Sequence, residues 1–252
     1  MLMEGKVAVV TGGGGMLGSA IGHRLAREGA TVALLDVALD KVRNTAEGIG
    51  REGGLAVAFH CDVTNTQDVR GVMEGIQRQY GKIDALVNNA GIMPHRDHSV
   101  LEMDEAVWHQ IYDINVHGLA LCLKFGLPHM PDGSAVLNMS SFVAFMGSSN
   151  PQEAYGASKG AIIALTRSLA VQCGPRNIRV NALCPGPILT PHVEGFFPTE
   201  EAKAIRLSRI PLGRFGRPED VASAALFFVS DQSSWITGQA LLLDGGISVN
   251  YF

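Results

Sequence analysis

Two side chains capable of acid–base chemistry lie four residues apart in the second half of the chain. Tyr155 and Lys159 belong to the segment Gln152–Cys173, whose apolar residues predict a long helix, so the two side chains share one helix face. A tyrosine normally titrates near pH ~10, but an opposite charge within about 4–6 Å can lower its pKa. The pair therefore predicts a general acid/base. Because such pairs are most often ordinary features of a helix surface, the prediction needs further support.

The residues 138–141 (Asn-Met-Ser-Ser) give that support. They stand at the end of the apolar run Ala135–Met139, which predicts a buried strand shortly before the helix with Tyr155. In open α/β sheets the ligand crevice lies at the carboxyl ends of the strands. The sequence thus predicts that Ser140 and Ser141 lie at the same crevice as the tyrosine.

A glycine-rich turn near the amino terminus is a second candidate site. The run Val7–Val10 leads into residues 11–18 (TGGGGMLG), which precede the periodic apolar residues of a helix. Gly13, Gly15 and Gly18 fit the dinucleotide pattern G-x-G-x-x-G in the strand–turn–helix context that it requires. Glycines let the backbone approach a pyrophosphate, and the helix N-terminus offers free N–H groups. We therefore expect a dinucleotide here.

An acidic residue stands where a bound dinucleotide would place its adenosine ribose. Asp36 follows the second β-type run, 18 residues after Gly18. A carboxylate there can accept both ribose hydroxyls and would repel a 2′-phosphate. Neither the glycine turn nor Val37 offers a cation for that phosphate. The sequence therefore predicts NAD as the cofactor.

The composition excludes several other classes of protein. The 252 residues are 46% apolar and 17% charged, with a net charge of -4 and no Lys/Arg cluster, which argues against a nucleic-acid partner. The four cysteines form no C-x-x-C pattern, which disfavours a zinc site or a disulfide framework. The first apolar run starts too early for a signal peptide, and no stretch resembles a membrane span. We expect a cytoplasmic protein without a metal ion.

Seven short apolar runs alternate with helical segments such as Leu17–Glu28 and Gln67–Tyr80. The runs are continuous rather than alternating, which suits parallel strands buried on both faces. This order predicts a single domain over residues 1–252, with the α/β class and a Rossmann-like, doubly wound parallel sheet of about seven strands that has helices on both faces. The predicted strands are Val7–Val10, Thr31–Leu35, Leu55–His60, Ala85–Asn88, Ala135–Met139, Arg179–Leu183 and Gln239–Leu243.

These residues resemble the short-chain dehydrogenase/reductase family, in its short single-domain branch, over essentially the whole chain. The glycine turn is similar to the family's T-G-x-x-x-G-x-G loop, and the tyrosine–lysine pair to its Y-x-x-x-K motif. The N-N-A-G motif is present at 88–91, the D-V pair at 62–63 and the P-G pair at 185–186. The end of the chain, residues 238–246, is similar to the family's last strand.

The resemblance implies the roles of individual residues. Asn115, Ser141, Tyr155 and Lys159 would be catalytic, with Asn115 holding a water that links Lys159 to solvent. The implied cofactor-binding residues are Gly12, Gly14, Gly15, Met16, Leu17, Gly18, Asp36, Asp62, Val63, Asn89, Ala90, Gly91, Tyr155, Lys159, Pro185, Gly186, Ile188 and Thr190.

Two positions depart from the family's pattern. Met16 stands where the family has the middle glycine of its loop, so a side chain enters near the phosphates. Ser141 lies 14 residues before Tyr155, one more than the commonest spacing, which leaves Ser140 as the alternative catalytic serine. We prefer Ser141 because the loop 142–151 can absorb an extra residue.

The segment Pro185–Pro198 is the one plausible long loop, and a short helix follows it with Thr199 as the expected N-cap. Residues 187–210 are the candidate lid. The segment is too apolar for a loop that is exposed to solvent. It therefore predicts a substrate lid that excludes water or, equally, a surface packed on another subunit. The apolar residues after Ser141 could form the opposite wall, which favours a mainly apolar substrate. The apolar residues of these two walls are Phe142, Val143, Phe145, Met146, Ile188, Leu189, Val193, Phe196 and Phe197.

Polar residues near this pocket leave several interpretations open. His95 could line the substrate mouth, whereas metal binding by the histidines is disfavoured because no carboxylate/His motif accompanies them. Arg206, Arg209 and Arg214 could bind an anionic group. Solvated ion pairs with carboxylates such as Asp220 are the more common role for such arginines.

The site predicts hydride transfer between NAD and a secondary alcohol or ketone, with Tyr155 exchanging the hydroxyl proton and Ser141 positioning the substrate oxygen. The alternatives are a 3-oxoacyl-type reductase of the same family and a catalytically silent NAD-binding sensor or scaffold. Because Tyr155 and Lys159 are both present, an enzyme is favoured. The resemblance also implies a homotetramer, and the apolar helices Gln152–Cys173 and Val116–Leu127 are consistent with subunit packing.

Overall fold

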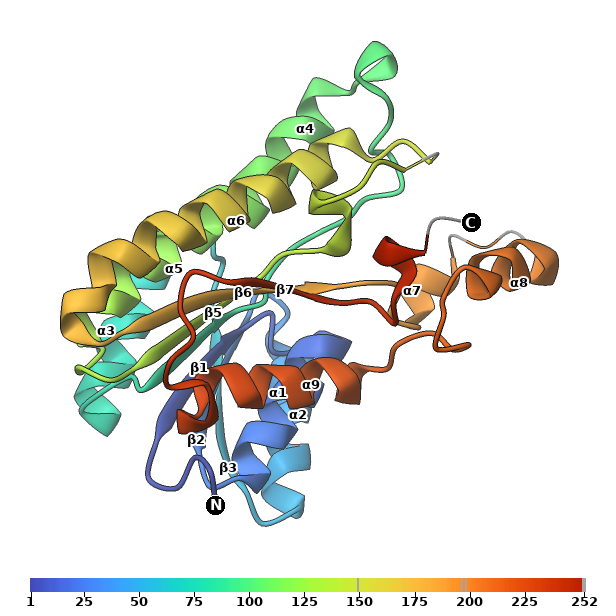
Figure 1. Ribbon diagram of the computed structural model, residues 1–252. Coiled ribbons are helices and arrows are strands. Elements are labelled where there is room, and N and C mark those ends of the chain that lie inside the picture. The colour runs from blue at the N-terminus through green and yellow to red at the C-terminus, as the bar shows by residue number, and fades with distance from the viewer. Residues whose placement is uncertain (149, 196, 198, 251–252) are drawn as a thin grey trace.

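Seven parallel strands form one sheet in the order β3-β2-β1-β4-β5-β6-β7 (Figure 1). The protein is described by a computed structural model that covers residues 1–148, 150–195, 197 and 199–250. Every predicted strand is confirmed, with its ends within two residues of the expected ones. The strands are β1 (Val7–Thr11), β2 (Thr31–Asp36), β3 (Leu55–His60), β4 (Ala85–Asn88), β5 (Ala135–Met139), β6 (Arg179–Pro185) and β7 (Ala240–Leu243).

Helices cover both faces of the sheet, so the structure confirms the predicted α/β class (Figure 1). On one face lie α1 (Met16–Arg27), α2 (Leu39–Arg51) and α9 (Pro218–Val229). On the other face lie α3 (Thr66–Tyr80), α5 (Leu119–Gly126) and α6 (Glu153–Cys173), with α4 (Glu105–Tyr112) beside α6. The short helices α7 (Pro191–Glu194) and α8 (Glu200–Ser208) follow the carboxyl end of β6.

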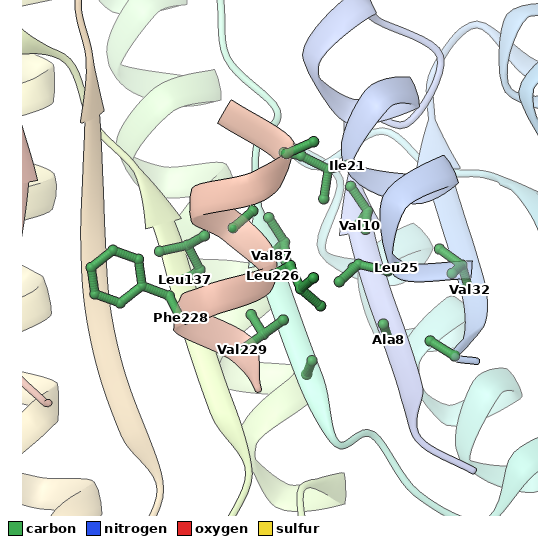
Figure 2. Packing of buried hydrophobic residues seen from close by; sticks show 14 of the residues in the cluster. Ala8, Val10, Ile21, Leu25, Val32, Val87, Leu137, Leu226, Phe228 and Val229 are labelled. Atoms are coloured by element: carbon green, nitrogen blue, oxygen red, sulfur yellow. The ribbon is translucent and has the colours of Figure 1, made fainter. Parts of the chain in front are cut away.

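The two apolar cores lie on opposite faces of the same strands. In β1, Ala8 and Val10 belong to the core under α1 and α9, whereas Val7 and Val9 belong to the core under α3, α5 and α6. This alternation follows from the two-residue period of a strand. Figure 2 shows the first core, in which side chains of α1 and α9 pack together against β1, β4 and β5. Burial on both faces explains why the strand sequences are continuously apolar.

The order of the strands reverses at β1. β2 pairs with one edge of β1 and β4 with the other, so their connections leave in opposite directions. In doubly wound sheets this reversal opens a crevice at the carboxyl ends of the two central strands. The glycine turn follows β1 and the Asn88–Gly91 segment begins at the end of β4, so the fold brings these two motifs to one crevice.

Two predicted helical segments differ in detail from the structure. The expected helix Val116–Leu127 is a π-helix, Asp113–Gly118, followed by α5. The expected loop before Thr199 contains α7, while Thr199 caps α8 as predicted, accepting the N–H of Ala202 at 3.1 Å. Within the described residues, no helix is both long and apolar enough to cross a membrane.

Candidate active site

The glycine turn is held by close backbone packing that excludes larger residues. Gly12 has a φ of +65°, and a Cβ on Gly18 would lie 2.1 Å from the carbonyl oxygen of Gly12. Both positions therefore need glycine. Helix α1 begins directly after Gly15 without a side-chain cap, which leaves first-turn N–H groups without a partner inside the helix. Met16, at the first position of α1, is 47% exposed and does not disrupt the turn.

Hydrogen bonds between the end of β1 and the segment that follows β4 hold this turn in place. Thr11 Oγ1 accepts the backbone N–H groups of Asn89 and Ala90, each at 3.0 Å. The side-chain amide of Asn89 donates to the carbonyl oxygens of Thr11 (3.0 Å) and Gly12 (3.3 Å). The N-N-A-G segment therefore shapes the glycine turn while also lining the cavity beside it.

Backbone donors orient the carboxylate of Asp36 at the end of β2. Its Oδ2 accepts the N–H of Gly14 and its Oδ1 the N–H of Ala38, both at 2.9 Å. Asp36 lines the main cavity, but Gly14 does not. The N–H of Gly14 is therefore engaged by Asp36, and the cofactor contact of Gly14 stays a prediction. Lys41 on α2, which the sequence did not single out, packs against Gly14, where an added Cβ would lie 2.8 Å from that of Lys41.

The two serines after β5 have different partners. Ser140 Oγ donates to the carbonyl oxygen of Lys159 at 2.8 Å, so this hydroxyl fastens β5 to α6. Ser141 forms a hydrogen bond with the side chain of Tyr155. Although both serines line the cavity, the Ser141 hydroxyl is the one beside the tyrosine, which supports the preference for Ser141.

Tyr155 and Lys159 lie together in the first turns of α6, as their spacing predicted. Lys159 is 4% exposed, and its Nζ donates to the carbonyl oxygen of Met139 at 2.9 Å and lies 5.5 Å from the centre of the Tyr155 ring. Burial lowers the pKa of Lys159 to about 8. Burial also raises the pKa of Tyr155, against the opposing effect of the Ser141 hydrogen bond. The expected lowering of the Tyr155 pKa is therefore wrong for the cofactor-free protein, because desolvation of the phenolate outweighs its neighbours.

Asn115 is fully buried in the π-helix behind this group. Its Oδ1 accepts the backbone N–H of Ile92 at 2.8 Å, and its Nδ2 donates to the Ile92 carbonyl (3.0 Å) and to Ser158 Oγ (3.1 Å). The side chain thus links the loop after β4 to α6 and does not line the cavity. π-Helical turns often occur at functional sites because they displace a backbone group from the regular helix.

One cavity of about 1960 Å³ joins these parts. It exceeds the ~300–1,000 Å³ of a typical small-molecule pocket, so it has room for a dinucleotide and a second molecule. His95, Phe142, Val193 and Phe197 line it, whereas Phe196 lies outside the described residues. Within the described chain, no group of three His, Cys, Asp or Glu side chains could hold a metal ion. The predicted site residues that line the cavity are Gly12, Gly15, Met16, Leu17, Gly18, Asp36, Asp62, Val63, Asn89, Ala90, Gly91, Ser141, Tyr155, Lys159, Pro185, Gly186, Ile188 and Thr190.

Asp97 is a residue of this site that the sequence analysis missed. It is buried and lines the cavity, and its carboxylate accepts the backbone N–H groups of Ala154 and Tyr155 at the start of α6. The available signal was the absence of a capping residue before this helix, since Gln152 makes no side-chain cap. The partner itself lies 58 residues away and has no local signature.

Comparisons with known proteins agree with this architecture. Residues 15–248 match the family model described as enoyl-(acyl carrier protein) reductase. The chain is 40% identical to the 3-oxoacyl-[acyl-carrier-protein] reductase of Thermotoga maritima, over 99% of this chain and 100% of that protein. It is 34% identical to the meso-2,3-butanediol dehydrogenase of Serratia marcescens, over 99% and 97% respectively.

A solved structure shows the same fold. The short-chain type dehydrogenase/reductase from Mycobacterium marinum matches with a TM-score of 0.91 and 33% identity, over 97% of this chain and 96% of that one. Since model, relatives and structure agree over nearly the full length, the chain belongs to the short-chain dehydrogenase/reductase family of NAD(P)-dependent oxidoreductases.

Proposed function

We propose that this chain transfers a hydride between NAD and a mainly apolar secondary alcohol or ketone, with Tyr155 as the general acid/base. The observation that carries the proposal is that Tyr155, hydrogen-bonded to Ser141, lines the same cavity as Asp36 and the glycine turn. An acid–base group and a dinucleotide cradle in one cavity suit oxidoreduction of a carbinol carbon.

The residues present fit a dinucleotide. The close approach at Gly12 and Gly18 forms a cradle that a Cβ would fill, and the first turn of α1 has N–H groups for a pyrophosphate. Asp36 is held where it can accept ribose hydroxyls and repel a 2′-phosphate, which favours NAD over NADP. Bound NAD supplies or accepts the hydride at its nicotinamide ring.

The chain's own residues would then manage the proton. Tyr155 accepts the hydroxyl proton during alcohol oxidation and returns it during ketone reduction. Ser141 holds the substrate oxygen next to the tyrosine. The Lys159 ammonium, 5.5 Å from the centre of the Tyr155 ring, would bind the nicotinamide ribose. Asn115, in the π-helix, would hold a water that connects Lys159 with solvent.

The surroundings of the site support the rest of the assignment. Phe142, Val143 and Met146 line one side of the cavity and Ile188, Val193 and Phe197 another, which favours an apolar substrate. We assign residues 187–210, with α7 and α8, as a lid within one catalytic domain that spans residues 1–252. We further propose a cytoplasmic homotetramer that uses the outer face of α6, where Val171 is 79% exposed.

A 3-oxoacyl-type reductase is the second candidate. It is favoured by the 40% identity to the Thermotoga maritima protein of that name. This alternative retains the same roles for Tyr155, Ser141 and Lys159 and differs in the substrate. A silent NAD-binding sensor is the remaining alternative.

A turnover screen followed at the NADH absorbance tests the proposal. It offers aliphatic, aryl and 3-oxoacyl ketones and the matching alcohols, with NAD(H) and NADP(H) in parallel. We expect turnover with NAD(H), and a loss of about 10²–10⁴-fold in Tyr155→Phe with NADH binding retained. Activity that survives in Tyr155→Phe contradicts the mechanism. NADH binding without turnover of any compound favours the sensor.

A further inference from the structure

Two arginines at the end of α8 line the cavity that contains Tyr155: Arg206 lies in the helix and Arg209 is its C-cap. Arg206 and Arg209 are three residues apart, so their side chains lie on neighbouring positions of one helix face. Helix α8 lies beyond the carboxyl end of the sheet, on the far side of α7 from β6 (Figure 1). Both arginines therefore come from the segment that follows β6, whereas the glycine turn follows β1.

Neither arginine has a carboxylate partner among the described residues. Neighbouring cations do: Lys203 pairs with Glu194 at 3.2 Å, and Arg214 forms a bidentate pair with Asp220 at 2.7 and 3.0 Å. Arg214, the third arginine that the sequence offered for an anion, is thereby neutralised and does not line the cavity. Arg206 and Arg209 are left as two positive charges side by side.

The acidic groups of the cavity do not neutralise this pair. Asp36 accepts backbone N–H groups at the end of β2, Asp62 accepts the N–H and hydroxyl of Thr64, and Asp97 caps α6. These three carboxylates accept hydrogen bonds from residues other than the two arginines. The fourth acid that lines the cavity, Asp113, forms no ion pair with either arginine. The positive charge on α8 therefore faces a cavity in which none of these acids is paired with it.

The surroundings of Arg206 make an unpaired charge unfavourable. The side chain is partly buried, and the apolar residues Ile205 and Phe197 line the same cavity. Burial and the adjacent Arg209 lower the pKa of Arg206, yet a guanidinium stays protonated at neutral pH. Two like charges in a partly apolar wall are stabilised when an anion binds between them.

We propose that Arg206 and Arg209 form a subsite for an anionic group, a carboxylate, sulfonate or phosphate, at the end of the substrate remote from the reacting carbon. The inference rests on the proposed oxidoreductase function and adds the substrate's charge to it. The substrate would have an apolar middle, in contact with residues such as Phe142 and Val193, and an anionic end on α8. Arginine suits this role because its planar fork binds oxyanions bidentately.

The test uses a series of methyl ketones with two to six methylene groups, each ending in a carboxylate, a sulfonate, a phosphate or a neutral primary amide. For each chain length, kcat/KM with NADH is measured for the anion and the amide. We expect the wild type to prefer an anion. We also expect Arg206→Met to lower the anion-to-amide ratio by about 10- to 100-fold, mainly through KM, and Arg209→Met to lower it less.

Two control variants test whether the effect comes from the subsite rather than from a change in net charge or in folding. Arg43→Met removes an exposed arginine of α2 that does not line the cavity and should leave the ratio unchanged. Arg206→Lys should restore part of the preference, because the positive charge returns without the bidentate fork. A ratio that Arg206→Met and Arg209→Met leave unchanged, or a wild type that prefers the amide, overturns the inference while the proposed function stands.

Binding measured without turnover distinguishes the two proposals. Calorimetry with the Tyr155→Phe variant, saturated with NADH, compares the affinity of the same anions and amides with and without Arg206→Met. Tighter binding of the anion that depends on Arg206 supports the subsite. If the wild type also reduces none of these ketones, the subsite stands and the proposed chemistry is wrong. Equal binding of anion and amide overturns the subsite.

Discussion

The carboxylate of Asp97 accepts the backbone N–H of Tyr155 at 2.8 Å, although 58 residues separate them in the chain. Its other oxygen accepts the N–H of Ala154 at 3.2 Å. Because Gln152 provides no side-chain cap, Asp97 takes the place of a local N-cap and satisfies the first turn of α6. The segment after the N-N-A-G motif thereby holds the turn that carries the tyrosine.

Replacing Asp97 should therefore affect both stability and activity. We expect Asp97→Ala to destabilise the protein by about 1–2 kcal/mol, as for other lost caps. Displacement of Tyr155 should also lower kcat by at least about tenfold, since reacting groups tolerate little misplacement. Thermal unfolding and ketone reduction measure the two effects.

Asp104→Ala is the matched control. Asp104 caps α4 through the N–H groups of Ala106 and Val107 and also pairs with Arg96, but it has no bond to α6. A similar loss of stability with little loss of kcat is expected for this variant. If both variants reduce kcat equally, Asp97 is only a structural cap.

Replacing each of the two serines after β5 should affect a different property, kcat for Ser141 and stability for Ser140. Ser141→Ala removes the partner of Tyr155 and should lower kcat by about 10²-fold, with NADH affinity and melting temperature nearly unchanged. Ser140→Ala removes the bond to the Lys159 carbonyl and should destabilise the protein by about 1 kcal/mol. Fluorescence titration with NADH, turnover and thermal unfolding report these quantities. A larger kcat loss in Ser140→Ala would reverse the assignment of the catalytic serine.

Asp36→Ala should shift the cofactor preference. Loss of the carboxylate removes the repulsion of a 2′-phosphate, and Lys41 packs beside Gly14, whose N–H Asp36 accepts. We expect the ratio of kcat/KM for NADPH over NADH to rise by about 10- to 100-fold. Asp40→Ala, which removes an exposed carboxylate of α2, controls for net charge. An unchanged ratio in Asp36→Ala would show that another residue selects the cofactor.

Lys159→Met should stabilise the cofactor-free protein while it abolishes turnover. The pKa of Lys159 is about 8 in the folded protein, below the ~10.4 of an unfolded lysine, so a buried ammonium costs stability below pH 8. After the loss of the bond to the Met139 carbonyl, the net gain at pH 7 should be on the order of 2 kcal/mol.

The lowered pKa of Lys159 also predicts how the difference in stability between the two proteins changes with pH. Between about pH 8 and pH ~10.4 the unfolded chain retains the lysine proton that the folded chain has lost, so the wild type gains stability as pH rises. The advantage of Lys159→Met in melting temperature should therefore shrink across this window. The comparison is made with Cys184→Ala in both proteins, because Lys159 influences the pKa of that thiol and its contribution would not cancel. The other buried thiols titrate in both proteins and cancel in the difference. An advantage that is constant with pH would contradict the lowered pKa.

Much of the fold could be predicted from the sequence because its signals are local. The seven strands are short apolar runs that must be buried on both faces, and their alternation with helices leaves a doubly wound parallel sheet as the expected arrangement. The pairing of Tyr155 with Lys159 follows from one helical turn, and the place of Asp36 from the end of a strand. Each of these inferences needs only neighbouring residues.

Other features depend on contacts between distant segments. The cap of α6 by Asp97, the linkage of Ser158 to Asn115 and the neutralisation of Arg214 by Asp220 each require the folded geometry. The pKa of Tyr155 is raised rather than lowered as expected from the sequence, because the desolvation of its phenol depends on which segments surround the ring in the folded protein.

The sequence by itself determined the strands, the order of the motifs and the candidate acid–base pair, since these follow from periodicity and chain spacing. Only the tertiary structure decided which serine meets Tyr155, that the N–H of Gly14 donates to Asp36, and that Arg206 and Arg209 line the cavity without a carboxylate partner among the described residues. Burial and partner choice depend on the packing of segments far apart in the chain, and that packing has no local signature in the residues themselves.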